Sequence, residues 1–393
     1  MSRMVVRPGM RLQDLDSSTG WRQRVVRVLL VSGMAGVLAL SGCGKFFPRI
    51  TGGGGSGSSG DYLYAGNLAS ATVAGFSIAS AAMDVSSGSP YTMALTPTSL
   101  AVTPNDDYLF VGGAGGIYTY AIGTDGALTE AGNNAYAQVP DPAVLRVDPT
   151  GTYLIGGDAL SGTVYVFQIG TDGALSQVGS TLTLNTDYPV TDLEIATNGS
   201  NYYVYASCGT GGIYAMQLAN GALTELTNGN YAPKTTNAAD QGMAVSPDGD
   251  YLFAAETVTG GVRIFSIGTN GSLTETSSSP VATGTAPWAV LVDATGSYVY
   301  VADRTKAQIT QWSLSSGKLT SIGTAIATGS LPVQLVEDNS KTYVAVVDSG
   351  ANDSGTNYDI EMYTIGSTGA LTKFTTATTG TTPTEANSLA ATH

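Results

Sequence analysis

A strand pattern that begins with tyrosine and recurs along the chain is the sequence feature that most constrains the fold. Seven copies follow one another at intervals of 45 to 50 residues, and each has the alternating or continuous apolar residues typical of a β-strand. Such regular self-similarity indicates a protein built from equivalent structural units. The leading residues are Tyr62, Tyr108, Tyr153, Tyr203, Tyr251, Tyr298 and Tyr343.

Three further strand patterns surround most copies, so the repeating unit has four strands. A short apolar stretch closed by a turn precedes the tyrosine, as in residues 243–249, and an alternating strand follows it, as in residues 261–267. A glycine turn and a short last strand come next, as in Gly271-Ser-Leu-Thr. We therefore expect an all-β, seven-bladed β-propeller with four-stranded antiparallel blades. A solenoid would have shorter coils, and separate units of this length would bury too little apolar surface to be stable.

The two ends of the repeat region predict how the ring closes. No inner-strand pattern precedes Tyr62, whereas residues 387–393 form an inner-strand pattern that no blade follows. We expect this C-terminal strand to complete blade 1, because closure removes exposed sheet edges that would favour aggregation. Residues 61–393 then form one domain.

The first 43 residues have the pattern of a lipoprotein signal peptide. Three arginines precede an apolar run of 13 residues, Val28 to Leu40, which is too short to span a bilayer comfortably. The run ends in Leu40-Ser-Gly-Cys43, which resembles a lipobox, so Cys43 is the expected site of lipidation. Residues 44–60 are rich in Gly and Ser and are expected to form a flexible linker. We expect an exported protein, lipid-anchored to the cell envelope at the outer membrane or the periplasmic face.

Charge and rare residues exclude several classes of function. Without residues 1–42 the chain has 10 basic and 28 acidic residues, a net charge of −18, which disfavours nucleic acid and anionic lipid headgroups as partners. We expect a monomer that meets the membrane only through its lipid anchor. Cys208 has a strand context and is expected in the core, and the one histidine is His393, the last residue.

The starts of the seven inner strands predict a polar channel rim. Inner strands line the channel of a propeller, so these side chains are candidates for binding a small polar ligand or an envelope partner. A solvated funnel without a ligand is the alternative. The residues at these starts are Glu385, Thr98, Ala143, Asp192, Gln241, Trp288 and Gln334.

The repeat resembles that of the seven-bladed β-propeller lactonases, which include 6-phosphogluconolactonase and the propeller-type muconate cycloisomerase. The tyrosine-led strands, the Ser246-Pro-Asp-Gly249 turn and the Gly-Ala-Leu-Thr hairpins carry this resemblance over the whole domain. It implies a channel-rim site in which Glu256, Arg304 and Asp158 stand at family positions. The family's Pro-His-x-His reads Pro140-Asp141-Pro-Ala here, and none of the family's histidines is present.

Two functions are compatible with these residues. A lactonase would use Glu256, or Asp141 in place of a histidine, as the base and Arg304 to bind the carbonyl, provided that burial raises the carboxyl pKa towards neutrality. A non-catalytic propeller would instead bind a glycan, peptide or protein at the cell surface. Glu256 and Arg304 would then be an ion pair between neighbouring blades.

The remaining acidic residues suggest no metal site. Asp148, Asp248 and Asp293 are expected to form turns by accepting local backbone N–H groups. Residues 348–359 are rich in Asp and Asn but lack the ligand spacing of a calcium loop, so we expect a long polar loop there. We expect no cofactor.

Overall fold

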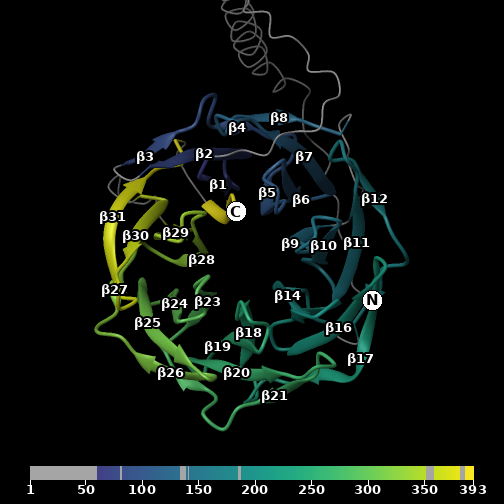
Figure 1. The fold of residues 1–393 in the computed structure, drawn as a ribbon, viewed down its shortest axis with the longest axis vertical. Helices are drawn as coiled ribbons and strands as arrows, with labels where there is room; N and C mark the ends of the chain where they lie inside the picture. The colour runs from purple at the N-terminus through teal and green to yellow at the C-terminus, as the bar shows by residue number, and fades with distance from the viewer. Residues whose placement is uncertain are drawn as a thin grey trace, which may run out of the picture. The chain divides into compact units, whose positions relative to one another are not determined.

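Seven antiparallel sheets stand as blades around a central channel in this computed structural model (Figure 1). The structure describes residues 60–79, 82–132, 139, 141–184, 187–350, 358–380 and 386–393. Each blade has a path of four strands, which confirms the predicted seven-bladed propeller. The predicted signal peptide, Cys43 and all of the linker but Gly60 lie outside the described residues. Within those residues, no helix is long and apolar enough to cross a membrane.

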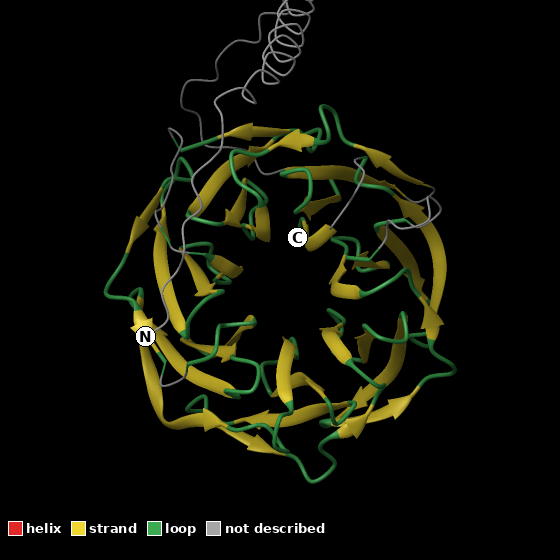
Figure 2. Cartoon of the chain, turned by 180° about the vertical axis from the view of Figure 1, so that it is seen from behind, coloured by secondary structure: helices red, strands yellow, loops and turns green. Residues whose placement is uncertain are grey.

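The inner strand of each blade faces the axis of the ring (Figure 2). The second strand begins with the repeated tyrosine or within two residues before it. From blade 1 to blade 7, the inner strands are β32 (Ala386–Ala391), β5 (Pro97–Val102), β9 (Pro142–Val147), β14 (Asp192–Asn198), β18 (Ala239–Val245), β23 (Pro287–Val292) and β28 (Pro332–Glu337). The second strands are β1 (Tyr62–Asn67), β6 (Tyr108–Gly113), β10 (Tyr153–Asp158), β15 (Asn201–Ser207), β19 (Tyr251–Thr257), β24 (Tyr298–Asp303) and β29 (Tyr343–Asp348).

The outer half of each blade is a hairpin, and four blades add a two-residue strand to it. The third strands are β2 (Thr72–Ala79), β7 (Gly116–Ile122), β11 (Thr163–Ile169), β16 (Ile213–Ala219), β20 (Gly261–Ile267), β25 (Gln308–Ser315) and β30 (Ile360–Ile365). The fourth are β3 (Ala82–Val85), β8 (Leu128–Glu130), β12 (Leu175–Gln177), β17 (Ala222–Tyr231), β21 (Leu273–Glu275), β26 (Lys318–Ser321) and β31 (Leu371–Ala377). The two-residue strands are β4 (Tyr91–Thr92), β13 (Leu182–Thr183), β22 (Val281–Ala282) and β27 (Ile326–Ala327).

The alternating strand directions give the ring two distinct faces. On one, which we call the rim face, the inner strands begin, the second strands end, and consecutive blades are connected. On the other, which we call the turn face, the tyrosine-led strands begin and the outer hairpins turn. Each described connection between strands therefore lies either on the rim face or on the turn face.

Contacts between tyrosine and glycine of adjacent blades explain why the two motifs recur together. The hydroxyl of Tyr62 donates to the carbonyl of Thr124 (2.8 Å), and that of Tyr108 donates to Thr171 (2.9 Å), in each case in the outer hairpin of the next blade. A Cβ on Gly126, the turn glycine of the first of these hairpins, would lie 2.3 Å from the ring of Tyr62. That glycine also has a φ of 73°, which favours glycine. Each repeat thus contributes half of a contact between blades.

The last strand of the chain completes the first blade, as predicted. β32 pairs with β1 in antiparallel register, from Leu63 opposite Ala391 to Asn67 opposite Ala386. Leu389 is 1% exposed and belongs to a cluster that packs blade 1 against blade 7. The ring is therefore held closed by a strand distant in sequence from its neighbours.

The predicted turn-forming aspartates are confirmed. Asp148 accepts the backbone N–H of Tyr153 at 2.6 Å, and Asp293 accepts that of Tyr298 at the same distance. Asp248 accepts the N–H of Asp250 at 3.1 Å. These carboxylates fasten the turn that leads from an inner strand into the next tyrosine-led strand.

Cys208, which follows the end of β15 at the rim face, and His393 provide no exposed nucleophile or base on that face. Cys208 is fully buried in the cluster between blades 3 and 4, as expected, and burial raises the pKa of its thiol to about 12. His393 follows the end of β32 on the turn face, where its backbone N–H donates to Asp106 at 2.8 Å.

Candidate functional site

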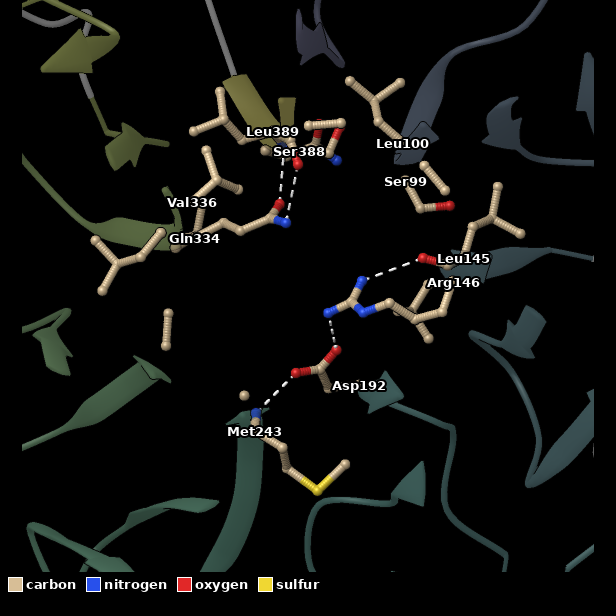
Figure 3. A pocket seen from close by; sticks show the side chains of 18 of the residues that line it. Ser99, Leu100, Leu145, Arg146, Asp192, Met243, Gln334, Val336, Ser388 and Leu389 are labelled. Atoms are coloured by element: carbon tan, nitrogen blue, oxygen red, sulfur yellow. Dashed lines mark hydrogen bonds and ion pairs between the residues drawn. The ribbon is translucent and has the colours of Figure 1, made fainter. Parts of the chain in front are cut away.

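A central cavity of about 990 Å³ lies among the seven inner strands. Its lining includes the side chains predicted for the rim, apart from Glu385, which lies outside the described residues. Figure 3 shows part of this lining, with polar groups from several blades directed towards the same space. The predicted rim residues that line the cavity are Thr98, Ala143, Asp192, Gln241, Trp288 and Gln334.

Arg304 and Trp288 form a stacked pair on the rim side of the cavity. The guanidinium carbon of Arg304 lies 4.2 Å from the centre of the Trp288 ring, which favours a cation–π interaction. Asp303, at the end of β24, accepts the N–H groups of Thr305 (3.1 Å) and Lys306 (3.0 Å) and so holds the turn that carries Arg304. Arg304 makes no ion pair with any described residue, so its charge is available to a ligand.

Glu256 lies outside this cavity. Its side chain is fully buried, and its two oxygens accept the N–H of Lys234 (2.6 Å) and the hydroxyl of Thr259 (2.7 Å). The described residues contain no ion pair between Glu256 and Arg304, so the alternative of an ion pair between blades is wrong. The predicted combination of Glu256 as base and Arg304 as carbonyl ligand is not brought together in one cavity either, because Glu256 is used to fasten two rim loops.

Asp158 and Asp141 do not line the cavity. Asp158 is buried at the end of β10 and accepts the N–H of Leu160 (2.8 Å) and the hydroxyl of Ser161 (3.0 Å). Burial, and then the charge of Asp158, raise the pKa of Asp141. The Oδ1 atom of Asp141 has no hydrogen-bond partner among the described residues.

Three acidic residues at the ends of second strands have the same structural role in their blades. Asp158, Glu256 and Asp303 each stand five residues after the leading tyrosine of their blade. All three accept hydrogen bonds from the rim turn that follows the second strand. Three blades therefore use a carboxylate at this position to hold a turn.

The strongest charged cluster in the channel was missed in the sequence. Arg146 in β9 donates from Nη2 to Asp192 (2.8 Å) and to Glu194 (3.3 Å), both in β14, and from Nη1 to the carbonyl of Leu145 (3.1 Å). Asp192 also accepts the N–H of Met243 at 2.7 Å, which connects it to blade 5 (Figure 3). We call Arg146, Asp192 and Glu194 the channel triad.

Both acids of the channel triad have raised pKa values. Burial raises the pKa of Glu194 to about 7, and the nearby Asp192 carboxylate adds to this while Arg146 opposes it. The pKa of Asp192 is also raised by burial. The side chain of Glu194 is 22% exposed, and its Oε2 atom has no partner among the described residues. Glu194 thus combines access to the cavity with a pKa near neutrality.

An alignment of the seven inner strands could have revealed two members of the triad, because they are charged where the other blades are apolar. Arg146 and Glu194 occupy the same position of their blades, opposite Ile155 and Tyr205 of the second strands. The other five blades have only apolar residues there. These are Ala101, Ala244, Leu291, Val336 and Ala390.

Gln334 uses its amide to hold the ring closed. Its side chain donates to the carbonyl of Leu389 (3.0 Å) and accepts the N–H of the same residue (2.8 Å), so that blade 7 is connected to the closing strand (Figure 3). Gln334 lines the cavity, but its polar atoms are directed to backbone. Gln241 and Trp288 keep their side chains free of such a connection.

The described residues contain no group of three His, Cys, Asp or Glu side chains arranged to hold a metal ion. The chemistry that can be built from them uses carboxylates and guanidinium groups. Hydrolysis of an activated carbonyl and binding of a polar ring are both compatible with such groups.

Comparison with known proteins gives a family and a set of similar structures. The family profile described as "Lactonase, 7-bladed beta-propeller" matches residues 62–387. The periplasmic gluconolactonase of Pseudomonas aeruginosa is 16% identical, with a TM-score of 0.69, and 85% of this chain and 99% of that one are covered. No curated protein sequence matches the chain.

Two further structures are similar over the same region. A candidate 6-phosphogluconolactonase from Bacteroides fragilis is 17% identical, with a TM-score of 0.69 and coverage of 85% and 98%. Another from Bacteroides uniformis is 15% identical, with a TM-score of 0.70 and coverage of 84% and 99%. At these identities the structural similarity shows the shared fold alone.

Proposed function

We propose that this chain, which belongs to the seven-bladed β-propeller lactonase family, hydrolyses a small uncharged lactone in its central channel. The observation that carries the proposal is the channel triad: a base with a pKa near 7 beside a guanidinium, at a level of the channel that is otherwise apolar. The gluconolactonase and 6-phosphogluconolactonase descriptions of similar structures support the same reaction class.

The triad supplies the two groups that lactone hydrolysis requires. Glu194 takes a proton from water, and the oxygen of that water attacks the lactone carbonyl. Arg146 stabilises the negative charge that develops on the carbonyl oxygen. Collapse of the tetrahedral intermediate breaks the ring C–O bond, and the proton held by Glu194 passes to the leaving alkoxide to give an open-chain hydroxy acid. Asp192 keeps Arg146 in place.

An uncharged ring fits the cavity better than a phosphorylated one. Two acids of the triad already offset the charge of Arg146, which leaves Arg304 as the unpaired cation among the described lining residues. A dianionic phosphate would meet a net negative triad. Trp288 offers a flat apolar surface, and Gln241 offers an amide, which together suit a polyhydroxylated ring.

Glu194→Gln is expected to lower kcat/KM for a neutral sugar lactone by about 100-fold to 10,000-fold, because the base is lost. In the unaltered protein, kcat/KM should rise with pH and level off above about pH 7, since only deprotonated Glu194 accepts the proton. The measurement is a pH series of lactone hydrolysis, corrected for spontaneous ring opening. Glu256→Gln is the control, and it should leave the midpoint of the profile unchanged because Glu256 lies outside the cavity.

The same assay tests the non-catalytic alternative. The stacked Trp288–Arg304 pair favours binding of a glycan at the rim, and such binding needs no base. Hydrolysis that is absent, or that Glu194→Gln leaves intact, would contradict the lactonase proposal. Ligand-dependent quenching of tryptophan fluorescence that persists in the inactive protein would then support a binding protein.

We also propose that the protein is exported and held at the cell envelope by a lipid on Cys43. The basic region, the apolar run and the lipobox-like residues support this proposal. Cys43→Ser is expected to abolish labelling of the protein with a radioactive fatty acid and to block cleavage by lipoprotein signal peptidase. Fatty-acid labelling and a globomycin-sensitivity test measure this. Lipid labelling that survives the substitution would show the assignment to be wrong.

A further inference from the structure

The apolar side chains that the ring exposes lie mostly on its rim face. Six large apolar residues are more than a third exposed in the described part of the chain, and five of them are in rim-face connections. The sixth, Val85, is 64% exposed on the outer strand β3. The five, which we call the apolar tips, are Leu160 (75%), Tyr188 (47%), Val258 (68%), Leu331 (39%) and Tyr358 (45%).

Exposed acidic side chains, unlike the apolar tips, lie mostly on the turn face among the described connections. The described turns of the turn face have ten aspartates, six of them at least partly exposed: Asp61, Asp107, Asp125, Asp172, Asp248 and Asp250. The described rim-face connections have two acids that are at least partly exposed, Asp141 and Asp187, and three cations, Lys234, Arg304 and Lys306. Among the described connections, more of the exposed acidic side chains therefore lie on the turn face than on the rim face.

Two of the apolar tips are held in a backbone conformation that disfavours them. Val258 has a φ of 71° and Leu331 a φ of 57°, in the left-handed region where glycine or asparagine is preferred. A β-branched side chain at such a φ is strained, and exposing it to water has no benefit for the isolated domain. Contact with an apolar environment outside the domain would remove these side chains from water.

From these observations we propose that the rim face rests on the surface of a lipid bilayer. The apolar tips come from separate turns of different blades around the channel mouth, whereas a protein interface has a continuous apolar centre. A bilayer accepts such separate tips, tyrosine suits its interface, and lysine and arginine suit its headgroups. The turn face, with its exposed aspartates, is directed away from the lipid. This surface acts in addition to any lipid on Cys43 and does not depend on lactone hydrolysis.

The test uses residues 60–393, which contain every strand of the closed ring and lack Cys43. Flotation with phosphatidylcholine vesicles, with and without phosphatidylglycerol, measures the partition coefficient. We expect binding to both kinds of vesicle that changes little with phosphatidylglycerol or with salt, because the apolar tips carry it. The triple variant Leu160→Asp, Val258→Asp, Leu331→Asp should bind at least about tenfold more weakly. Val85→Asp, an equally exposed residue off this face, should bind like the parent protein.

Three outcomes would overturn the proposal. One is the absence of vesicle binding by the parent protein, and another is an equal loss in Val85→Asp. The third is concentration-dependent dimerisation, measured by light scattering, that the triple variant abolishes while vesicle binding stays unchanged, since the face would then be an interface between two copies. The substituted positions are exposed, and matching circular dichroism spectra and melting temperatures would show that the variants are folded.

Discussion

Removal of residues 386–393 is expected to leave a ring that cannot close and that aggregates. Blade 1 would lose its inner strand, and the apolar side chains of blades 1 and 7 that pack with Leu389 would be exposed. Loss of the buried Leu389 side chain alone removes roughly 1.5 to 3 kcal/mol of stabilisation. The backbone groups of β1 would also form a free sheet edge next to the channel. Size-exclusion chromatography with light scattering, together with thermal unfolding, measures the effect.

A rearranged chain gives the matched control. The same eight residues are placed before Asp61 and joined to it by Asp-Gly, so that Thr392-His-Asp-Gly-Asp-Tyr62 reproduces the spacing of Ser246-Pro-Asp-Gly-Asp-Tyr251 in blade 5. Blade 1 would then be continuous like the other blades, and a monomer of near-parental stability is expected. A truncated chain that stays monomeric and melts like the parent would show that the closing strand is dispensable.

Arg263→Met is expected to destabilise the fold by about 3 to 5 kcal/mol, because it leaves a buried carboxylate without its partner. Arg263 in β20 is 3% exposed and binds Asp240, which is fully buried, at 2.9 Å. It also contacts Glu275 at 3.4 Å and lies over the ring of Phe265 at 4.7 Å. Arg263 binds the Oδ2 atom of Asp240, and the Oδ1 atom has no hydrogen-bond partner among the described residues. Urea unfolding of the variant and the parent measures the difference.

The stability lost in Arg263→Met should also depend on pH. Burial raises the pKa of Asp240 to about 7 although Arg263 opposes the shift. An aspartate in an unfolded chain has a pKa of about 3.9, so the folded state holds the proton more tightly, and this group's contribution to stability decreases as pH rises from about 4 to 7. Removing Arg263 raises the pKa of Asp240 further. The variant should therefore lose less stability at pH 5 than at pH 8.

A second substitution separates the buried charge from simple loss of packing. Arg263→Met combined with Asp240→Leu removes both members of the pair and should recover a large part of the lost stability, with a weaker dependence on pH. A double variant as unstable as Arg263→Met at both pH values would contradict the assignment of the effect to the uncompensated carboxylate.

The blades and their closure were predictable because they depend on local patterns repeated seven times. The tyrosine-led strand and the glycine hairpin each have a clear sequence pattern, and the contact of Tyr62 with Gly126 shows why they recur together. The turn-forming use of Asp148 and Asp293 was also predictable, since it involves atoms within five residues along the chain.

The site was less predictable because small shifts of register decide which side chains face the channel. Most inner strands have a bulge near their start, as between Pro287 and Ala289, whereas β14 pairs without one from Asp192 onward. Asp192 and Gln334 pair with the residue four positions after the leading tyrosine of their blades, as Ala289 does. They thus stand one position further along their strands than Trp288. Side chains alternate between opposite sides of a strand, so a shift of one residue changes what each contacts. A comparison of strand starts cannot detect this shift.

The sequence by itself determined the number of blades and the strand that closes the ring, because periodic patterns and short-range turns encode them. Only the tertiary structure decided which polar groups meet. It placed Arg146 beside Glu194, 48 residues away along the chain, and buried Glu256 among loop hydrogen bonds. The physical reason is that a channel site is assembled from different blades, and the contacts among them depend on the register of each inner strand against its own neighbour.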